Sequence, residues 1–257
     1  MQISSPQSPK KRSPLSILLI GPPGGGKTTL AMGFPGIAFC DCDQNLDGPE
    51  LFMRKKIPTL AYGIEPITFD EEGKPVPTEA CFDRLISKVN SLAKEEAAKV
   101  ICIDGVTMIN EFIIRKVLKE QGGSVMKPQD WGPFKSYLLK LLVQTLRGTG
   151  KTTIVTCHEY PVEKPQTDVK EGILNAKIVG YRPAVQGGIS DYFGGFFTDM
   201  LRCTCSPAAA GRLEFKLQTV RDSMNDLKNS LGLPAEITWK DGELGYLKLE
   251  PYLKDLL

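Results

Sequence analysis

The stretch SILLIGPPGGGKTTL, residues 16–30, decides the fold of this 257-residue chain. Its apolar start predicts a buried strand, and the residues from Lys27 onward predict a helix. Between the two lies the pattern G-x-x-x-x-G-K-[ST], whose fixed positions are Gly21, Gly26, Lys27 and Thr28. A glycine-rich turn between a strand and a helix is the setting in which this pattern holds nucleotide phosphates.

Each position of this phosphate loop has a chemical reason. Glycines let successive backbone N–H groups turn towards phosphate oxygens, and the start of the helix adds its positive dipole end. Lys27 is expected to reach the terminal phosphates of ATP, and the Thr28 hydroxyl to ligand Mg²⁺. The residues that we expect to bind ATP are Gly21, Pro22, Pro23, Gly24, Gly25, Gly26, Lys27, Thr28 and Thr29.

A second lysine-containing stretch, GTGKTT at 148–153, resembles the phosphate loop only in part. Thr145 stands where the first glycine would be required. The stretch also lies between a predicted helix and a predicted strand, which is the reverse of the order that phosphate binding needs. We therefore expect its glycines to end a helix.

Apolar runs and helical patterns alternate along most of the chain. This alternation predicts an α/β fold with a mainly parallel sheet flanked by helices. Two runs near the C-terminus, DMLRCTC and RLEFKLQTV, are expected to form an antiparallel strand pair. Residues 44–76 are expected to be irregular. The other predicted elements are strands at IAFCD, KVICID and TTIVTC, and helices near 78–97, 107–119 and 134–146.

Length and composition predict one domain, over residues 14–257, because 257 residues with 41% hydrophobic content fit a single core. Residues 1–13 are rich in Ser, Pro and Lys and predict a disordered leader. Residues 160–195 are polar and Gly-rich, and they are too long for an ordinary connection. They predict a functional loop or hairpin excursion.

Charge and hydropathy exclude several classes of protein. The formal net charge of +2, from 32 basic and 30 acidic residues, predicts no global attraction to polyanions, so any nucleic-acid site must be local. No apolar run approaches the roughly 18 residues of a membrane span, and the N-terminus lacks a secretion signal. We expect a cytoplasmic protein without a membrane partner, in the host cytoplasm if it is phage-encoded.

The run VICID ends in Asp104, at the carboxyl end of a predicted buried strand. An acid at that place can hold Mg²⁺ through water, beside phosphates bound at the loop. Thr28 and Asp104 are therefore the predicted metal site.

The segment FCDCDQNLD, residues 39–47, resembles a strand end of RecA-type recombinases. The resemblance implies that Asp43 activates the water that attacks ATP. The family has Glu at this place, so the shorter Asp43 must act through a changed geometry or an extra water. The alternative is that Asp43 caps the following turn.

Two further catalytic assignments come from the same resemblance. TIVTCHE is similar to the strand that ends in a γ-phosphate sensor, which implies that role for His158; the alternative is a structural histidine. QTVRD places Arg221 where the family presents a cation to the ATP of a neighbouring subunit. The alternative is a surface arginine.

Residues 14–239 resemble the RecA-like ATP-binding proteins of phages, including the single-strand-annealing group. The resemblance implies an ATP- and Mg²⁺-dependent ATPase that acts on single-stranded DNA in recombination, annealing or replication. It further implies a homo-oligomer with ATP at its subunit interfaces.

The 160–195 excursion follows His158, where the resembled family keeps a DNA loop. It mixes cations with aromatic rings, as single-strand binding requires, but its acidic residues nearly cancel its charge, so a subunit-contact hairpin is a rival. A partner loop is expected at QGGSVMKPQDWGP, although its Trp131 could instead pack under the next helix. The basic and aromatic residues are Tyr160, Lys164, Lys170, Lys177, Tyr181, Arg182 and Tyr192, and the acidic ones are Glu163, Asp168, Glu171 and Asp191.

Two other functions fit the same loop. One is an ATP-gated loader or regulator of a replication or recombination protein, such as a replicative helicase, with the excursion as its docking surface. The other is a small-molecule kinase, which would need an arginine-rich lid over the nucleotide.

Overall fold

The structure, a computed structural model, describes residues 14–58, 61–167, 174–186, 188–208 and 211–253. The predicted leader at 1–13 lies outside the described residues, as do Asp168, Lys170 and Glu171 of the excursion.

The core is a nine-stranded sheet in the order β3-β2-β4-β5-β1-β7-β8-β9, with β6 paired to β5 outside this path. The strands are β1 (Ser16–Gly21), β2 (Ile37–Asp41), β3 (Tyr62–Pro66), β4 (Val100–Asp104), β5 (Thr152–Thr167), β6 (Leu174–Pro183), β7 (Asp199–Pro207), β8 (Leu213–Gln218) and β9 (Glu236–Lys240). The pairs from β3 through to β7 are parallel, and β7, β8 and β9 pair antiparallel.

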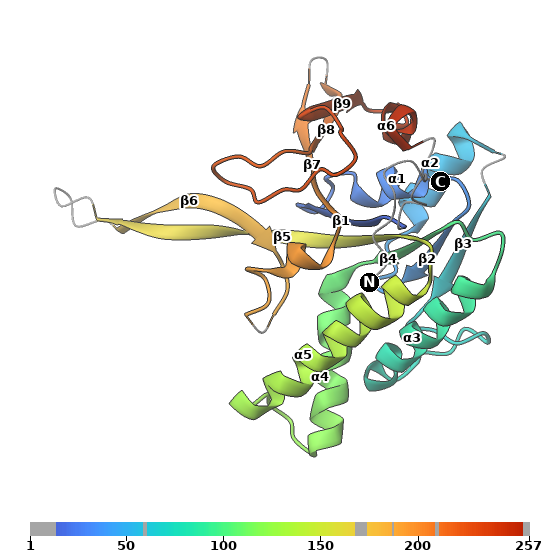
Figure 1. Cartoon of the computed structure of the whole chain (residues 1–257), viewed down its shortest axis with the longest axis vertical. Coiled ribbons are helices and arrows are strands. Elements are labelled where there is room, and N and C mark those ends of the chain that lie inside the picture. Colours follow the sequence, from blue (N-terminus) through green and yellow to red (C-terminus); the bar gives the residue numbers. More distant parts are fainter. Residues whose placement is uncertain (1–13, 59–60, 168–173, 187, 209–210, 254–257) are drawn as a thin grey trace, which may run out of the picture.

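Helices cover both faces of the sheet (Figure 1). The helices are α1 (Lys27–Met32), α2 (Asp47–Lys56), α3 (Thr78–Lys94), α4 (Val106–Gln121), α5 (Trp131–Leu139) and α6 (Gly245–Leu253), with 3₁₀ turns η1 (Pro128–Asp130) and η3 (Phe193–Phe196) and a π-helical segment η2 (Lys140–Leu146). Alternate residues of β1 separate the two cores: Leu18 and Ile20 pack with α3, α4 and α5, whereas Ile17 and Leu19 pack with α1 and α6. The predicted fold class is therefore confirmed.

The expectation that residues 44–76 are irregular is wrong, because they contain α2 and β3. Both elements have weak sequence patterns. Among its residues α2 fully buries only Met53, and β3 is an edge strand with no fully buried residue. An element that buries so little carries little hydrophobic periodicity.

Trp131 begins α5, three residues before the predicted start of that helix. It is half-buried and packs edge-on against Phe134, with ring centroids 5.4 Å apart. Its position matches the packing alternative for this residue.

The excursion contains a hairpin that protrudes from the body of the protein (Figure 1). β5 is 16 residues long; its first part pairs with strands of the central sheet and its second part pairs with β6. His158 is its last residue paired with β1, and Glu159 is its first residue paired with β6. The paired segments 159–167 and 174–183 are together called the protruding hairpin below. Among the described residues, no helix is both long and apolar enough to cross a membrane.

Candidate nucleotide site

The phosphate loop joins β1 to α1 and lies tightly against β7. Gly24 and Gly26 have left-handed backbones, with φ of 72° and 86°. A Cβ at Gly21 would overlap the carbonyl oxygen of Cys203, and one at Gly25 would lie 2.7 Å from the same atom. Glycine is required at these two positions by the closeness of the neighbouring strand.

The loop opens onto a cleft of about 470 Å³, a size typical of small-ligand sites. The carboxyl ends of β2 and β4 lie at this edge of the sheet beside residues 156–158 of β5, and this edge is where ligands bind in parallel α/β folds. The structure thus brings together ten of the predicted site residues and adds six others. The lining consists of Pro23, Gly24, Gly25, Gly26, Lys27, Thr28, Thr29, Asp43, Asn45, Pro49, Asp104, Gly105, Thr156, Cys157, His158 and Phe215.

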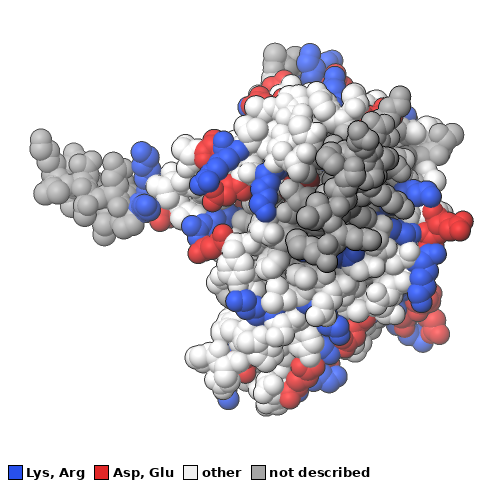
Figure 2. Space-filling model, in the orientation of Figure 1, with Lys and Arg blue, Asp and Glu red and all other residues white. Residues whose placement is uncertain are grey.

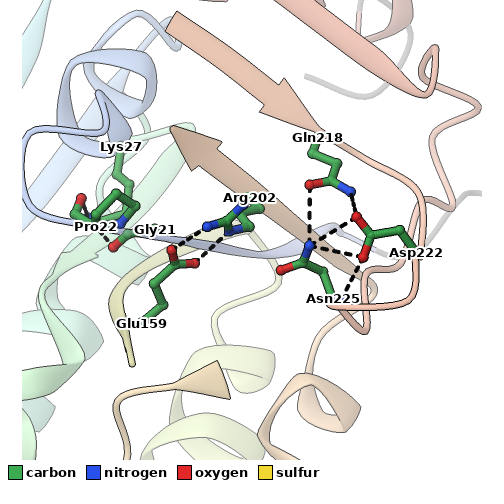
Figure 3. Close-up of polar contacts among 8 residues, drawn as sticks. All are labelled: Gly21, Pro22, Lys27, Glu159, Arg202, Gln218, Asp222 and Asn225. Atoms are coloured by element: carbon green, nitrogen blue, oxygen red, sulfur yellow. Dashed lines mark hydrogen bonds and ion pairs between the residues drawn. The ribbon is translucent and has the colours of Figure 1, made fainter. Parts of the chain in front are cut away.

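Lys27 is folded back into the loop (Figure 3). Its ammonium donates hydrogen bonds of 2.9 Å to the carbonyl oxygens of Gly21 and Pro22. Burial lowers the pKa of Lys27, an effect opposed by the nearby Asp104 carboxylate. A buried cation held only by neutral carbonyls is well placed to exchange them for phosphate oxygens.

Asp104 lies beside Thr28, as the predicted metal site requires. The Thr28 hydroxyl donates to Asp104 Oδ2 at 2.9 Å, and the Thr156 hydroxyl donates to Oδ1. Burial raises the pKa of Asp104, while both hydroxyls and Lys27 favour its charged form. Hydroxyl and carboxylate oxygens are the ligands that Mg²⁺ prefers, so these residues fit a magnesium-bound nucleotide in the glycine cradle.

Asp43 faces the cleft with an unsatisfied oxygen. Its Oδ1 is buried without a hydrogen-bond partner among the described residues, and its Oδ2 lies 3.5 Å from where a Cβ on Gly105 would be. A buried polar atom left unpaired costs about 1–3 kcal/mol, which marks a place for a water or ligand.

Asp41, which sequence reasoning passed over, caps the turn after β2. Its Oδ1 accepts the Gln44 backbone N–H at 2.8 Å, so the capping role considered for Asp43 belongs to its neighbour. Burial raises the pKa of Asp41 to about 6, and Asp43 and Asp104 add to this effect. Both acids stand at the same strand end, but Asp41 holds the turn whereas Asp43 lines the cleft.

His158 also lines the cleft, opposite Gly21 in the β1–β5 register. Its Nδ1 is buried and has no hydrogen-bond partner within the described part of the chain. Burial, followed by the charge of Lys27, lowers the pKa of His158, so the imidazole is neutral near pH 7. A neutral ring with a free nitrogen can respond to a phosphate or a water placed beside it.

Arg221 lies outside the cleft. Its side chain is 76% exposed and pairs with Asp226 at 2.9 Å, in a loop at the root of the protruding hairpin. Asp222 fixes that loop by accepting hydrogen bonds from Gln218 and Asn225 (Figure 3). The structure does not bring Arg221 to the ATP site of its own chain.

Phe215 on β8 is a cleft residue without a sequence signal. Its Cδ1 lies 2.8 Å from where a Cβ on Gly26 would be, and its ring stacks on Trp239 with centroids 5.7 Å apart. The requirement for glycine at position 26 therefore comes partly from a strand far along the chain.

Residues 13–235 match the AAA domain family. The chain belongs to this family. It is similar to the crystal structure of the flagellar accessory protein FlaH from Methanocaldococcus jannaschii, with a TM-score of 0.36 and 12% identity over 84% of this chain and 87% of that chain. No curated protein sequence matches the chain. The match supports a P-loop ATPase domain of AAA type, and the phosphate loop of this domain lines the cleft described above.

Replacing Lys27 with alanine should weaken ATP binding by roughly 10- to 100-fold, because about 1.5–3 kcal/mol of charge-assisted hydrogen bonding disappears. Titration with a fluorescent ATP analogue measures the change. Lys151→Ala is a matched control, since that lysine stands in the second GKT stretch and binds the carbonyl oxygens of Leu92 and Ala98 at the end of α3. Equally weakened binding in both variants would contradict the assignment.

Proposed function

We propose that this AAA-family protein is a RecA-like, Mg²⁺-dependent ATPase of phage type that acts on single-stranded DNA in recombination, annealing or replication. The observation that carries the proposal is the double role of β5. His158 on this strand lines the nucleotide cleft, and the next residue, Glu159, begins the protruding hairpin. A change at the phosphates therefore has a direct covalent path to the hairpin.

The cleft residues support hydrolysis as well as binding. Lys27 would neutralise charge at the terminal phosphates, and Thr28 and Asp104 would hold Mg²⁺, which supplies further neutralisation of that charge. Asp43 has the free oxygen needed to accept a proton from an attacking water. His158 is placed to contact the same region from the end of β5.

Replacing Asp43 with alanine should leave ATP binding nearly unchanged and slow hydrolysis by about 10²- to 10⁴-fold, the usual range for removal of a general base. Phosphate release under saturating ATP measures turnover, and nucleotide titration measures binding. The exposed Asp47, which does not line the cleft, provides the control Asp47→Ala. Unchanged turnover in the Asp43 variant would assign water activation to another acid.

Several charged residues of the protruding hairpin lie on opposite faces of its two strands. Residues that pair across an antiparallel ribbon share a face, and neighbours along a strand alternate. Tyr160 pairs with Arg182 and Lys164 pairs with Lys177, so all four share one face, called the basic face. Glu163 falls on the other face. Asp191, which follows the hairpin in the chain, forms an ion pair with Arg182 on the basic face. Among the described residues, the separation of charge is therefore clearest at Lys164 and Lys177.

The basic face has the features of a single-strand binding surface. Lys164 and Lys177 lie directly opposite each other, an arrangement that is unfavourable unless an anion lies between them. Tyr160 and Tyr192 are 38% and 42% exposed, and the Lys135 ammonium sits 5.2 Å from the Tyr192 ring. Figure 2 shows Lys and Arg side chains along the protruding hairpin, with some Asp and Glu side chains among them. Cations beside exposed rings support recognition of phosphates and stacked bases.

If the basic face binds single-stranded DNA, the DNA should raise ATP turnover of the wild type. The double variant Lys164→Glu and Lys177→Glu should weaken DNA binding about tenfold or more. The slope of log affinity against log salt should fall by about 0.7 for each phosphate that the variant no longer neutralises. Glu163→Lys, on the opposite face, is the control and should retain DNA binding. Anisotropy with a labelled oligonucleotide over a salt series measures all three proteins.

Absence of any DNA effect on wild-type turnover or assembly would contradict the DNA proposal. Retention of a replication or recombination protein after nuclease treatment would then favour the loader alternative. The kinase alternative requires a lid, but no described residue of the protruding hairpin lines the cleft.

We also propose that ATP lies at the interfaces of a homo-oligomer and that Arg221 acts on the ATP of a neighbouring subunit. The exposed position of Arg221 outside its own cleft supports this arrangement. A cation supplied by a neighbour makes hydrolysis depend on assembly.

Arg221→Ala should abolish turnover while retaining ATP binding, because its own cleft is intact. Mixing it with Lys27→Ala should restore part of the turnover, since each mutant supplies what the other lacks at mixed interfaces. Phosphate release by the mixture, compared with each protein alone, measures this complementation. Failure to complement would contradict a role for Arg221 in a neighbouring site.

A further inference from the structure

A largely buried ion pair crosses the end of β1 next to the phosphate loop. β1 lies between β5 and β7, and the pair joins Glu159 on β5 to Arg202 on β7. The contact is bidentate, with distances of 2.6 and 2.7 Å. The Arg202 and Glu159 side chains are 15% and 4% exposed. Figure 3 shows this pair between the phosphate loop on one side and the Asp222 loop on the other.

Arg202 also holds the root of the protruding hairpin. Its guanidinium lies 4.2 Å from the ring centroid of Tyr181 on β6. The Tyr181 backbone N–H donates to the carbonyl oxygen of Met224 at 2.9 Å, and the Ala184 N–H donates to that of His158 at 2.7 Å. Movement of Arg202 would therefore displace the hairpin at its base.

The same strand supports the phosphate loop. Cys203 follows Arg202, and its carbonyl oxygen is the atom that leaves no room for a Cβ at Gly21 or Gly25. In the strand register Arg202 lies beside Ile20, the residue before the loop. The loop cannot shift towards β7 without pushing the backbone that carries Arg202.

We infer that Glu159 and Arg202 are positioning residues that join the phosphate loop to the protruding hairpin, so that nucleotide binding reorients the hairpin. The inference rests on the proposed binding of ATP and is independent of DNA. Fold stability alone is a weak reason for such a pair, because the cost of burying two charges offsets much of their attraction. The fork of Arg202 suits the role, since it contacts a carboxylate and a ring at once.

Hydrogen exchange on the full chain, without DNA, tests the inference. Binding of a non-hydrolysable ATP analogue with Mg²⁺ should change exchange at 177–184 of the wild type by at least about threefold. In Glu159→Gln combined with Arg202→Met, nucleotide should still bind, as a fluorescent analogue shows, but exchange at 177–184 should no longer respond. Lys116→Met is the matched control. That lysine is 16% exposed, pairs with Asp83 and Glu120 on the helical layer, and should leave the response intact.

Arg202→Lys provides a second variant in case the double variant fails to fold. It keeps the buried charge but removes the fork, so it should bind nucleotide with a reduced hairpin response. A wild-type-sized change in exchange at 177–184 in a variant that binds nucleotide would overturn the inference. So would a wild type that binds nucleotide without any change in exchange there. If the titration showed that the wild type does not bind nucleotide, that result would contradict the proposed ATPase function itself. It is therefore distinguishable from a failure of the coupling inference alone.

Discussion

The absence of space beside Gly21 is the constraint on which the rest of the site depends. β1 ends against the Cys203 carbonyl of β7, so the chain must turn away as a glycine loop instead of continuing as a strand. This turn directs the loop over the carboxyl edge of the sheet and begins α1 there. The phosphate-binding geometry is thus a consequence of how three strands pack, with β1 parallel to both neighbours.

The sheet edge where β2 and β4 end gathers more negative than positive charge. Asp41, Asp43 and Asp104 stand there with Lys27 as the one lining cation among the described residues, and burial raises the pKa of Asp41 and Asp104. Clustered carboxylates in a water-poor cleft are unfavourable without a compensating cation. A bound Mg²⁺ would offset part of that repulsion, and together with Lys27 it would also neutralise the negative charge that nucleotide phosphates bring.

The sequence predicts the local parts of this site well and the distant parts poorly. The loop and Asp104 are contiguous patterns whose strand-to-helix order can be judged from hydrophobic periodicity. The elements α2 and β3 are not predicted from the sequence because they bury few side chains. The role of Phe215 is not predicted because only the order of strands in the sheet brings it to Gly26. Glu159 and Arg202 meet across an intervening strand, a contact that no spacing along the chain encodes.

The protruding hairpin shows why net charge is a poor guide to its surface. Lys164 and Glu163 cancel when their charges are summed, but successive side chains of a strand point to opposite faces. The two charges therefore lie on different surfaces of the hairpin. The same alternation directs Glu159 away from the basic face and towards Arg202. One strand, β5, carries the cleft histidine, Glu159 and part of the basic face in sequence, so it runs from the proposed nucleotide site to the proposed DNA surface. Coupling between them then needs movement only at its root.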